Sequence, residues 1–89
     1  MPVITNIETT DRANAAVNKQ MLQLPDLLLQ KGAIQLKGEF LEELGIDLPF
    51  ITKVKKGDRF FSKVHIYIVC KKYKVNANWL LGLEKNPFR

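Results

Sequence analysis

The chain has 89 residues, of which 46% are apolar and 26% are charged. This length supports one domain with one modest core, and the composition is that of an ordinary globular protein. The single cysteine excludes an internal disulfide and suits a reducing compartment. No apolar run approaches the roughly 20 residues of a membrane span, and the amino-terminal residues lack the pattern of a signal peptide. We therefore expect a cytoplasmic protein.

The formal net charge of +5 is unevenly distributed along the chain. Residues 1–49 contain four cations and seven anions, a net charge of −3, whereas residues 50–74 contain eight cations and one anion, a net charge of +7. A basic block of this kind is typical of a surface that binds a polyanion. A solvated lysine-rich surface has the same composition, so the block alone does not distinguish the two.

The first predicted helix is long and contains a proline. Residues 1–9 show no periodic pattern and are expected to form a flexible N-terminal arm. Thr10 or Asp11 then caps a helix in which apolar residues recur at helical spacing. Pro25 lies inside this stripe and either kinks the helix or splits it; we favour one kinked helix that ends at Lys31. The stripe consists of Val17, Met21, Leu24 and Leu28.

Two short amphipathic helices joined by a tight turn are predicted within residues 37–57. Gly45 ends the first, because glycine adopts the left-handed conformation at no steric cost. Asp47 is a good N-cap for the second helix, and Pro49 is tolerated in its first turn. Apolar side chains of the second helix are expected to point inward and its lysines outward. The inward residues are Phe50, Ile51 and Val54, and the outward residues are Lys53, Lys55 and Lys56.

The segment after Ser62, which is the next predicted N-cap, is ambiguous between strand and helix. Alternating branched residues in 64–70 favour a strand, yet apolar residues also recur there at helical spacing. No second strand is available for pairing, so we predict a helix. On this helix Val64 and Ile68 face away from the core stripe, and such exposed apolar residues predict a subunit contact.

Asn76 is predicted to cap a short last helix, which Gly82 closes. Residues 83–89 are expected to form a polar C-terminal tail, with Phe88 as a residue that docks on the domain. Taken together, these elements predict the all-α class, as a compact bundle of about five helices in residues 10–82.

This order of elements resembles the Cro and lambda-repressor-like helix-turn-helix family, also called the xenobiotic-response-element regulators. The resemblance covers roughly residues 17–83, and it implies a DNA-binding domain that acts as a transcriptional regulator, commonly repressor-like and as a homodimer. Four positions depart from the family pattern and bear on base reading more than on fold: Lys37, Leu41, Leu48 and Pro49. The matching residues are Glu39-Phe40, Leu44-Gly45-Ile46, Ile51-Thr52-Lys53-Val54, Gly57, Arg59, Ser62, Cys70, Tyr73 and Val75 through Gly82.

The resemblance also implies which residues meet DNA. In the family geometry the second helix of the motif, residues 47–56, enters the major groove with its N-terminus first. The residues that face base edges would then be Asp47, Leu48, Pro49, Thr52 and Lys53. Those that bind phosphates would be Lys37, Lys55, Lys56, Arg59, Ser62 and Lys63, with Ser62 acting through the helix amides that it caps.

Some of these residues have other readings. Asp47 is first of all a helix cap, and Arg59 has Glu42 or Glu43 as alternative partners. The alternative function is a protein–protein interaction module that keeps the fold without sequence-specific DNA reading. The apolar helix in 64–70 and the apolar pair Leu48-Pro49 favour that alternative.

No catalytic, cofactor or metal site is expected. His65 and Cys70 are the only histidine and cysteine, and residues five apart on a helix do not face one another. A metal site needs more ligands of this kind. Glu42 and Glu43 are adjacent and diverge around their helix, so they do not form an acid–base pair. His65 is instead expected to be a half-buried packing residue.

Overall fold

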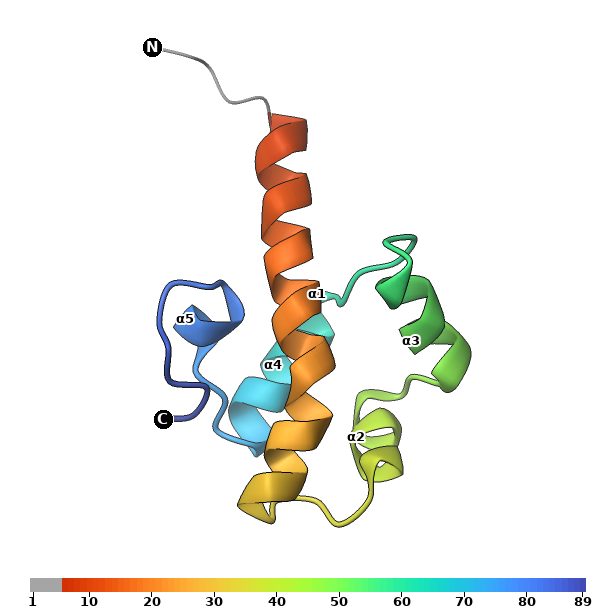
Figure 1. The fold of residues 1–89 in the computed structure, drawn as a ribbon, viewed down its shortest axis with the longest axis vertical. Coiled ribbons are helices and arrows are strands. Elements are labelled where there is room, and N and C mark those ends of the chain that lie inside the picture. The colour runs from red at the N-terminus through yellow and green to blue at the C-terminus, as the bar shows by residue number, and fades with distance from the viewer. Residues whose placement is uncertain (1–5) are drawn as a thin grey trace.

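A computed structural model describes residues 6–89, with side chains from Asp11 onward, and within that range the all-α prediction is confirmed. The described residues form five helices and no strand, apart from an isolated antiparallel bridge between Val75 and Phe88. The helices are α1 (Asn6–Lys31), α2 (Lys37–Leu44), α3 (Leu48–Lys55), α4 (Lys63–Lys72) and α5 (Ala77–Leu80). As Figure 1 shows, α1 runs through the molecule, with α5 on one side and α2 and α3 on the other.

The long helix α1 is continuous through Pro25, as the favoured reading predicted, and it ends at Lys31. Side chains of the predicted stripe are buried both before and after the proline, so packing on both sides holds the helix together despite the lost hydrogen bond. Its start was predicted wrongly, because the helix begins at Asn6 and not at Thr10 or Asp11.

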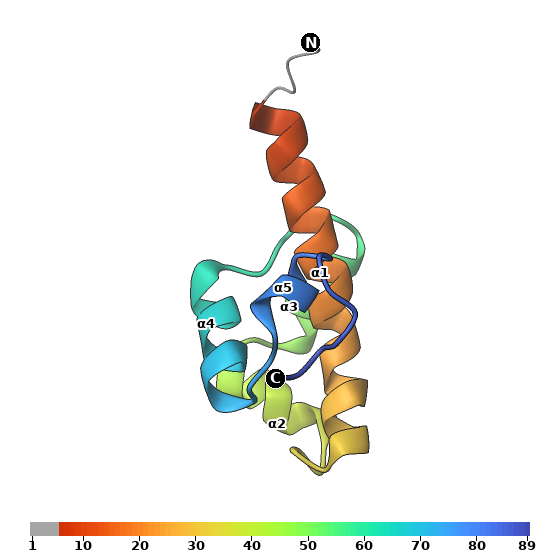
Figure 2. The same cartoon turned by 90° about the vertical axis from the view of Figure 1, so that its left-hand side faces the viewer.

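The prediction of a flexible arm over residues 1–9 is therefore wrong for residues 6–9. Residues 6–9 are helical, and residues 1–5 lie outside the described part of the chain. No glycine or proline occurs between residues 6 and 16, so nothing interrupts a helix that the packed residues further along already hold in place. The first half of α1 projects beyond the rest of the molecule (Figure 2).

The connection between α2 and α3 has the glycine C-terminus and the aspartate N-cap that the sequence predicted. Gly45 has φ 67°, and its N–H and that of Ile46 donate to the last carbonyls of α2, at 3.1 and 3.0 Å. The Asp47 carboxylate accepts the N–H of Phe50 at 2.9 Å and so caps α3. With Pro49 in the first turn of α3, the two helices are separated by only three residues.

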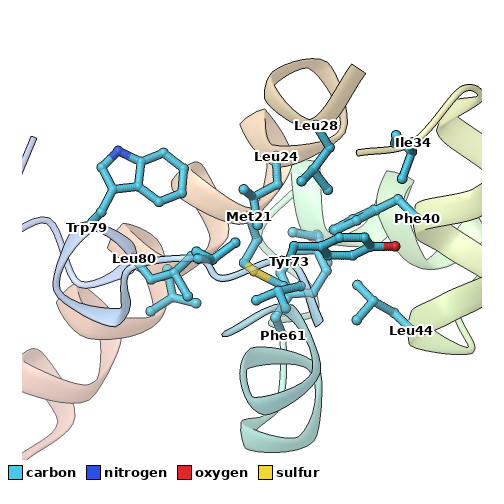
Figure 3. Close-up of a cluster of buried hydrophobic side chains, with 14 residues drawn as sticks. Met21, Leu24, Leu28, Ile34, Phe40, Leu44, Phe61, Tyr73, Trp79 and Leu80 are labelled. Atoms are coloured by element: carbon cyan, nitrogen blue, oxygen red, sulfur yellow. The ribbon is translucent and has the colours of Figure 1, made fainter. Parts of the chain in front are cut away.

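The core gathers around α1 (Figure 3). Met21, in the middle of the stripe, is fully buried; Trp79 lies toward one side of it and Phe40 toward the other. The single tryptophan of the chain is only 6% exposed, and the Gln20 side chain donates to its carbonyl oxygen at 3.0 Å. The buried set is Val17, Met21, Leu24, Leu28, Ile34, Phe40, Leu44, Val54, Phe61, Val69, Tyr73, Val75, Trp79 and Leu80.

The segment after Ser62 is a helix, so the choice of helix over strand is confirmed. The last helix is capped as predicted, because the Asn76 side chain accepts the N–H of Asn78 at 3.0 Å. The C-terminal segment 83–89 folds back on the domain: the N–H of Asn76 donates to the Pro87 carbonyl at 2.8 Å. Phe88 is partly buried against the core, in agreement with its predicted docking role.

Candidate functional site

The outward surface of α3 is the first candidate site, and it contains all five residues predicted to face base edges. Val54 is 3% exposed and fixes the inner side of the helix, with Phe50 and Ile51 partly buried beside it. We define the α3 outer face by the exposed residues of the helix and its N-cap, which are Asp47, Leu48, Pro49, Thr52, Lys53 and Lys55. At 100° per residue Thr52 lies near the middle of this face, and Lys53 and Lys55 flank it on opposite sides.

Two groups on this face already use part of their hydrogen-bonding capacity within α3. One oxygen of the Asp47 carboxylate accepts the N–H of Phe50. The Thr52 hydroxyl donates to the carbonyl oxygen of Leu48 at 3.1 Å. The hydroxyl proton of Thr52 is therefore occupied, and the side chain is free to accept rather than donate.

A hollow of about 210 Å³ brings Arg59 to the α3 outer face. It is lined by Asp47, Pro49, Phe50, Lys53 and Arg59, so two cations and one carboxylate border the same space. Among the side chains that the structure describes, the ion pairs are Lys37–Asp26 and Lys72–Glu43. Arg59 therefore pairs with neither Glu42 nor Glu43, which was its alternative reading.

The remaining predicted phosphate-binding residues lie in three places. Lys55 and Lys56 line a hollow of about 570 Å³ between the first half of α1 and the loop after α3. Lys37 shares another hollow with Lys55, but its ammonium group lies 2.9 Å from a carboxylate oxygen of Asp26. Ser62 and Lys63 are exposed at the N-terminal end of α4.

The acidic residues of α2 gather elsewhere. Glu39, Glu42 and Glu43 line a separate hollow between α2 and the end of α4, where Lys72 pairs with Glu43. The hydrogen bond to this carboxylate raises the pKa of the Lys72 ammonium. Part of the basic block of residues 50–74 is therefore unavailable to bind a polyanion, because Lys72 already pairs with an acidic residue of α2.

His65 packs as predicted and has a second role that sequence reasoning missed. Its ring lies edge-on to Phe50 and Phe61, at centroid distances of 5.6 and 5.8 Å. Its Nδ1 accepts the N–H of Ser62 at 3.1 Å, while the Ser62 hydroxyl accepts the N–H of His65 at 3.4 Å. This is a capping box with histidine in the place of the usual Glu or Gln. Burial lowers the pKa of the His65 imidazole.

Asn18 is a second residue that the sequence did not single out. Its Nδ2 donates to the carbonyl oxygen of Arg59 at 3.1 Å, and its Oδ1 accepts the N–H of Phe61 at 3.2 Å. These bonds join residues 41 and 43 positions apart, so no local pattern could have revealed them.

The two residues predicted for a subunit contact differ in exposure. Val64 is 64% exposed, whereas Ile68 is partly buried against the core. Tyr67, one turn after Val64, is 62% exposed. The exposed apolar surface of α4 is therefore made by Val64 and Tyr67, with Ile68 at its edge.

Comparisons of the chain with protein-family models, with curated proteins and with solved structures found no match. In the described part of the chain, no helix combines the length and apolar character needed to span a membrane. The same part holds no group of three or more His, Cys, Asp or Glu residues arranged to share a metal ion. The single thiol, Cys70, is half-buried, and burial raises its pKa.

Proposed function

We propose that this protein binds double-stranded DNA as a sequence-specific, repressor-like transcriptional regulator. In this proposal α2, the Gly45 turn and α3 act as a helix-turn-helix, and α3 enters the major groove. The observation that carries the proposal is the two-sidedness of α3: Val54 packs its inner side, while its outer face is exposed and carries Lys53 and Lys55. A helix of this kind has the width of the major groove, and its cations suit the phosphates on either side.

The α3 outer face supplies the groups that read bases. Lys53 would donate to the O6 or N7 of guanine, and Leu48, which is 69% exposed, would contact a thymine methyl group. Thr52 would accept from a base amino group, because its own proton is bound to the Leu48 carbonyl. Asp47 acts first as a cap, and its second carboxylate oxygen would accept from a cytosine amino group.

Cations around α3 would hold the protein in register on the phosphates. Lys55 and Lys56 border one side of the helix, and Arg59 lies beside Lys53 on the other. The amides at the start of α4, where Ser62 and Lys63 lie, would bind a further phosphate. Lys37 would have to leave Asp26 to join them, at little cost because exposed ion pairs are weak.

A homodimer is part of the proposal, with Val64 and Ile68 at the contact and Tyr67 extending it. A two-fold dimer would present two copies of α3 to half-sites one helical turn apart. Sedimentation at micromolar concentration should then show a dimer, and a monomer would remove this part of the proposal.

The test has two steps. Duplexes that the protein binds are first selected from a pool of random sequences, and the dissociation constant for the selected DNA is then measured over a range of salt concentrations. Neutralising about four to six phosphates per subunit predicts a log–log salt slope of about −4 to −5 per subunit. Lys53→Ala should reduce the ratio of the affinity for selected duplexes to the affinity for random duplexes. Lys56→Ala should lower both affinities by the same factor. Affinity that hardly changes with salt would contradict the proposal.

A second candidate is a protein-interaction module that keeps the fold and has lost sequence-specific reading. The exposure of Leu48 and Pro49 on the α3 outer face favours it, since recognition positions are more often polar. Equal affinity for all duplexes, together with a tight complex with another protein, would support this candidate over the first.

A further inference from the structure

The loop between α3 and α4 depends on α1 for its position. Its start is held by backbone bonds, because the N–H of Asp58 donates to the Lys53 carbonyl at 2.9 Å. After Asp58, neither the carbonyl of Arg59 nor the N–H of Phe61 has a backbone partner in the described part of the chain. Both groups bond instead to the side chain of Asn18.

Asn18 is well anchored for this task. It follows Val17, which is buried in the stripe of α1, and its own side chain is half-buried. Asparagine carries a donor and an acceptor in one planar amide, which is what the carbonyl of Arg59 and the N–H of Phe61 require together. Aspartate lacks the donor, and alanine lacks both groups.

This clamp fixes the backbone on both sides of Phe60 and at the root of the Arg59 side chain. Phe61 is buried next to the clamp, at 4% exposure, so the end of the loop cannot drift. Arg59 reaches the hollow that it shares with Lys53 and Asp47 on the α3 outer face. A loop free to move would spread the guanidinium over many positions and would lose entropy on binding.

We propose that Asn18 is a positioning residue that sets the contact of Arg59 with the DNA backbone. The first helix is thereby coupled to the DNA-binding surface, although Asn18 itself touches no DNA. This inference rests on the proposed function.

The experiment is a double-mutant cycle on the full chain, with Asn18→Ala, Arg59→Ala and the double variant. Dissociation constants for a random duplex are measured across a salt series, at a temperature where every variant gives the wild-type far-UV spectrum. Asn18→Ala should weaken binding about three- to ten-fold and reduce the salt slope by about 1, as Arg59→Ala does. The double variant should bind no more weakly than Arg59→Ala alone.

Two controls separate positioning from a general loss of structure. Gln23→Ala removes an amide of α1 that donates hydrogen bonds to the Lys19 carbonyl and to the Gln20 side chain, both within that helix, so the salt slope should not change. Lys37→Ala removes another proposed phosphate contact, on α2 and outside the hollow that Asn18 lines, so its effect should add to that of Asn18→Ala.

The outcomes distinguish this inference from the function it rests on. If the wild-type protein binds with a steep salt slope but the effects of Asn18→Ala and Arg59→Ala add, the positioning role is overturned alone. An unchanged slope in Asn18→Ala overturns it too. If the wild-type protein does not bind duplex DNA, the proposed function fails and this inference fails with it.

Discussion

Helices α3 and α4 begin in the same way and then differ in what they expose. Asp47 accepts the N–H of Phe50 and Ser62 accepts that of His65, three residues further along in each case. Both helices also carry lysines in their last turn. Both expose apolar side chains, Leu48 and Pro49 on α3 and Val64 and Tyr67 on α4. Only on α3 do two lysines flank an exposed polar residue, Thr52.

A count of cations overstates the surface that is free to bind a polyanion. Lysines at the end of a helix are stabilised by the helix dipole in any protein. Lys71 and Lys72 of α4 are of this kind, and Lys72 is also paired with Glu43. What sets α3 apart is that its cations flank an exposed helix face and have Arg59 beside them.

The largest expected effect comes from reversing charge at matched places. One double variant, Lys55→Glu with Lys56→Glu, changes charge at the end of α3. The other, Lys71→Glu with Lys74→Glu, changes the net charge by the same amount at the end of α4. The first pair should lower the affinity for duplex DNA by about 100-fold or more at an ionic strength of about 0.1 M, because it would remove two of the proposed phosphate contacts. The second pair should cost only a few-fold through the overall field. Fluorescence anisotropy of labelled DNA measures both affinities. Equal losses of affinity in the two double variants would contradict the proposal that α3, and not α4, binds DNA.

A smaller effect is expected from the two caps. Asp47→Ala should lower the free energy of unfolding by about 1–2 kcal/mol, because a charged acceptor at 2.9 Å is lost. Ser62→Ala should cost about 0.5–1 kcal/mol, since His65 still accepts the N–H of residue 62. Urea denaturation gives both values. Asp47→Asn is the matched control that keeps an acceptor, and a greater loss at Ser62 would reverse the predicted order.

The smallest effect concerns the pH dependence of α4. Burial lowers the pKa of His65 in the folded protein below its unfolded value of 6.5, so the unfolded state binds more protons. The contribution of His65 to stability should therefore be constant above pH 6.5 and fall as pH drops below it, until the folded-state pKa is passed. His65→Gln, which keeps a side-chain acceptor for the capping box, should remove this slope. Urea denaturation of the wild type and of this variant at several pH values isolates the slope as the difference between the two, because His65 is the only histidine.

Sequence reasoning located four helix ends from rules that span only a few residues. Gly45, Asp47, Ser62 and Asn76 all end or begin helices as predicted, because each acts on backbone groups within four residues of itself. The inward and outward residues of α3 followed from helical periodicity for the same reason.

It missed specific polar contacts between distant segments. The Lys37–Asp26 ion pair joins α1 to α2, and it takes a cation that seemed free for phosphate binding. The Asn18 clamp joins residues 41 and 43 positions apart. The start of α1 was missed because residues 6–9 show no apolar periodicity, and the helix there continues one that is stabilised further along.

The place of Trp79 gives experiments on this protein an internal reporter. The only tryptophan of the chain belongs to α5 and is 6% exposed. Helix α5 lies on the other side of α1 from α3 (Figure 1), so the fluorescence of Trp79 should respond to unfolding rather than to a ligand at α3. Emission from one cuvette can thus show whether a variant that has lost affinity is still folded, without a second label.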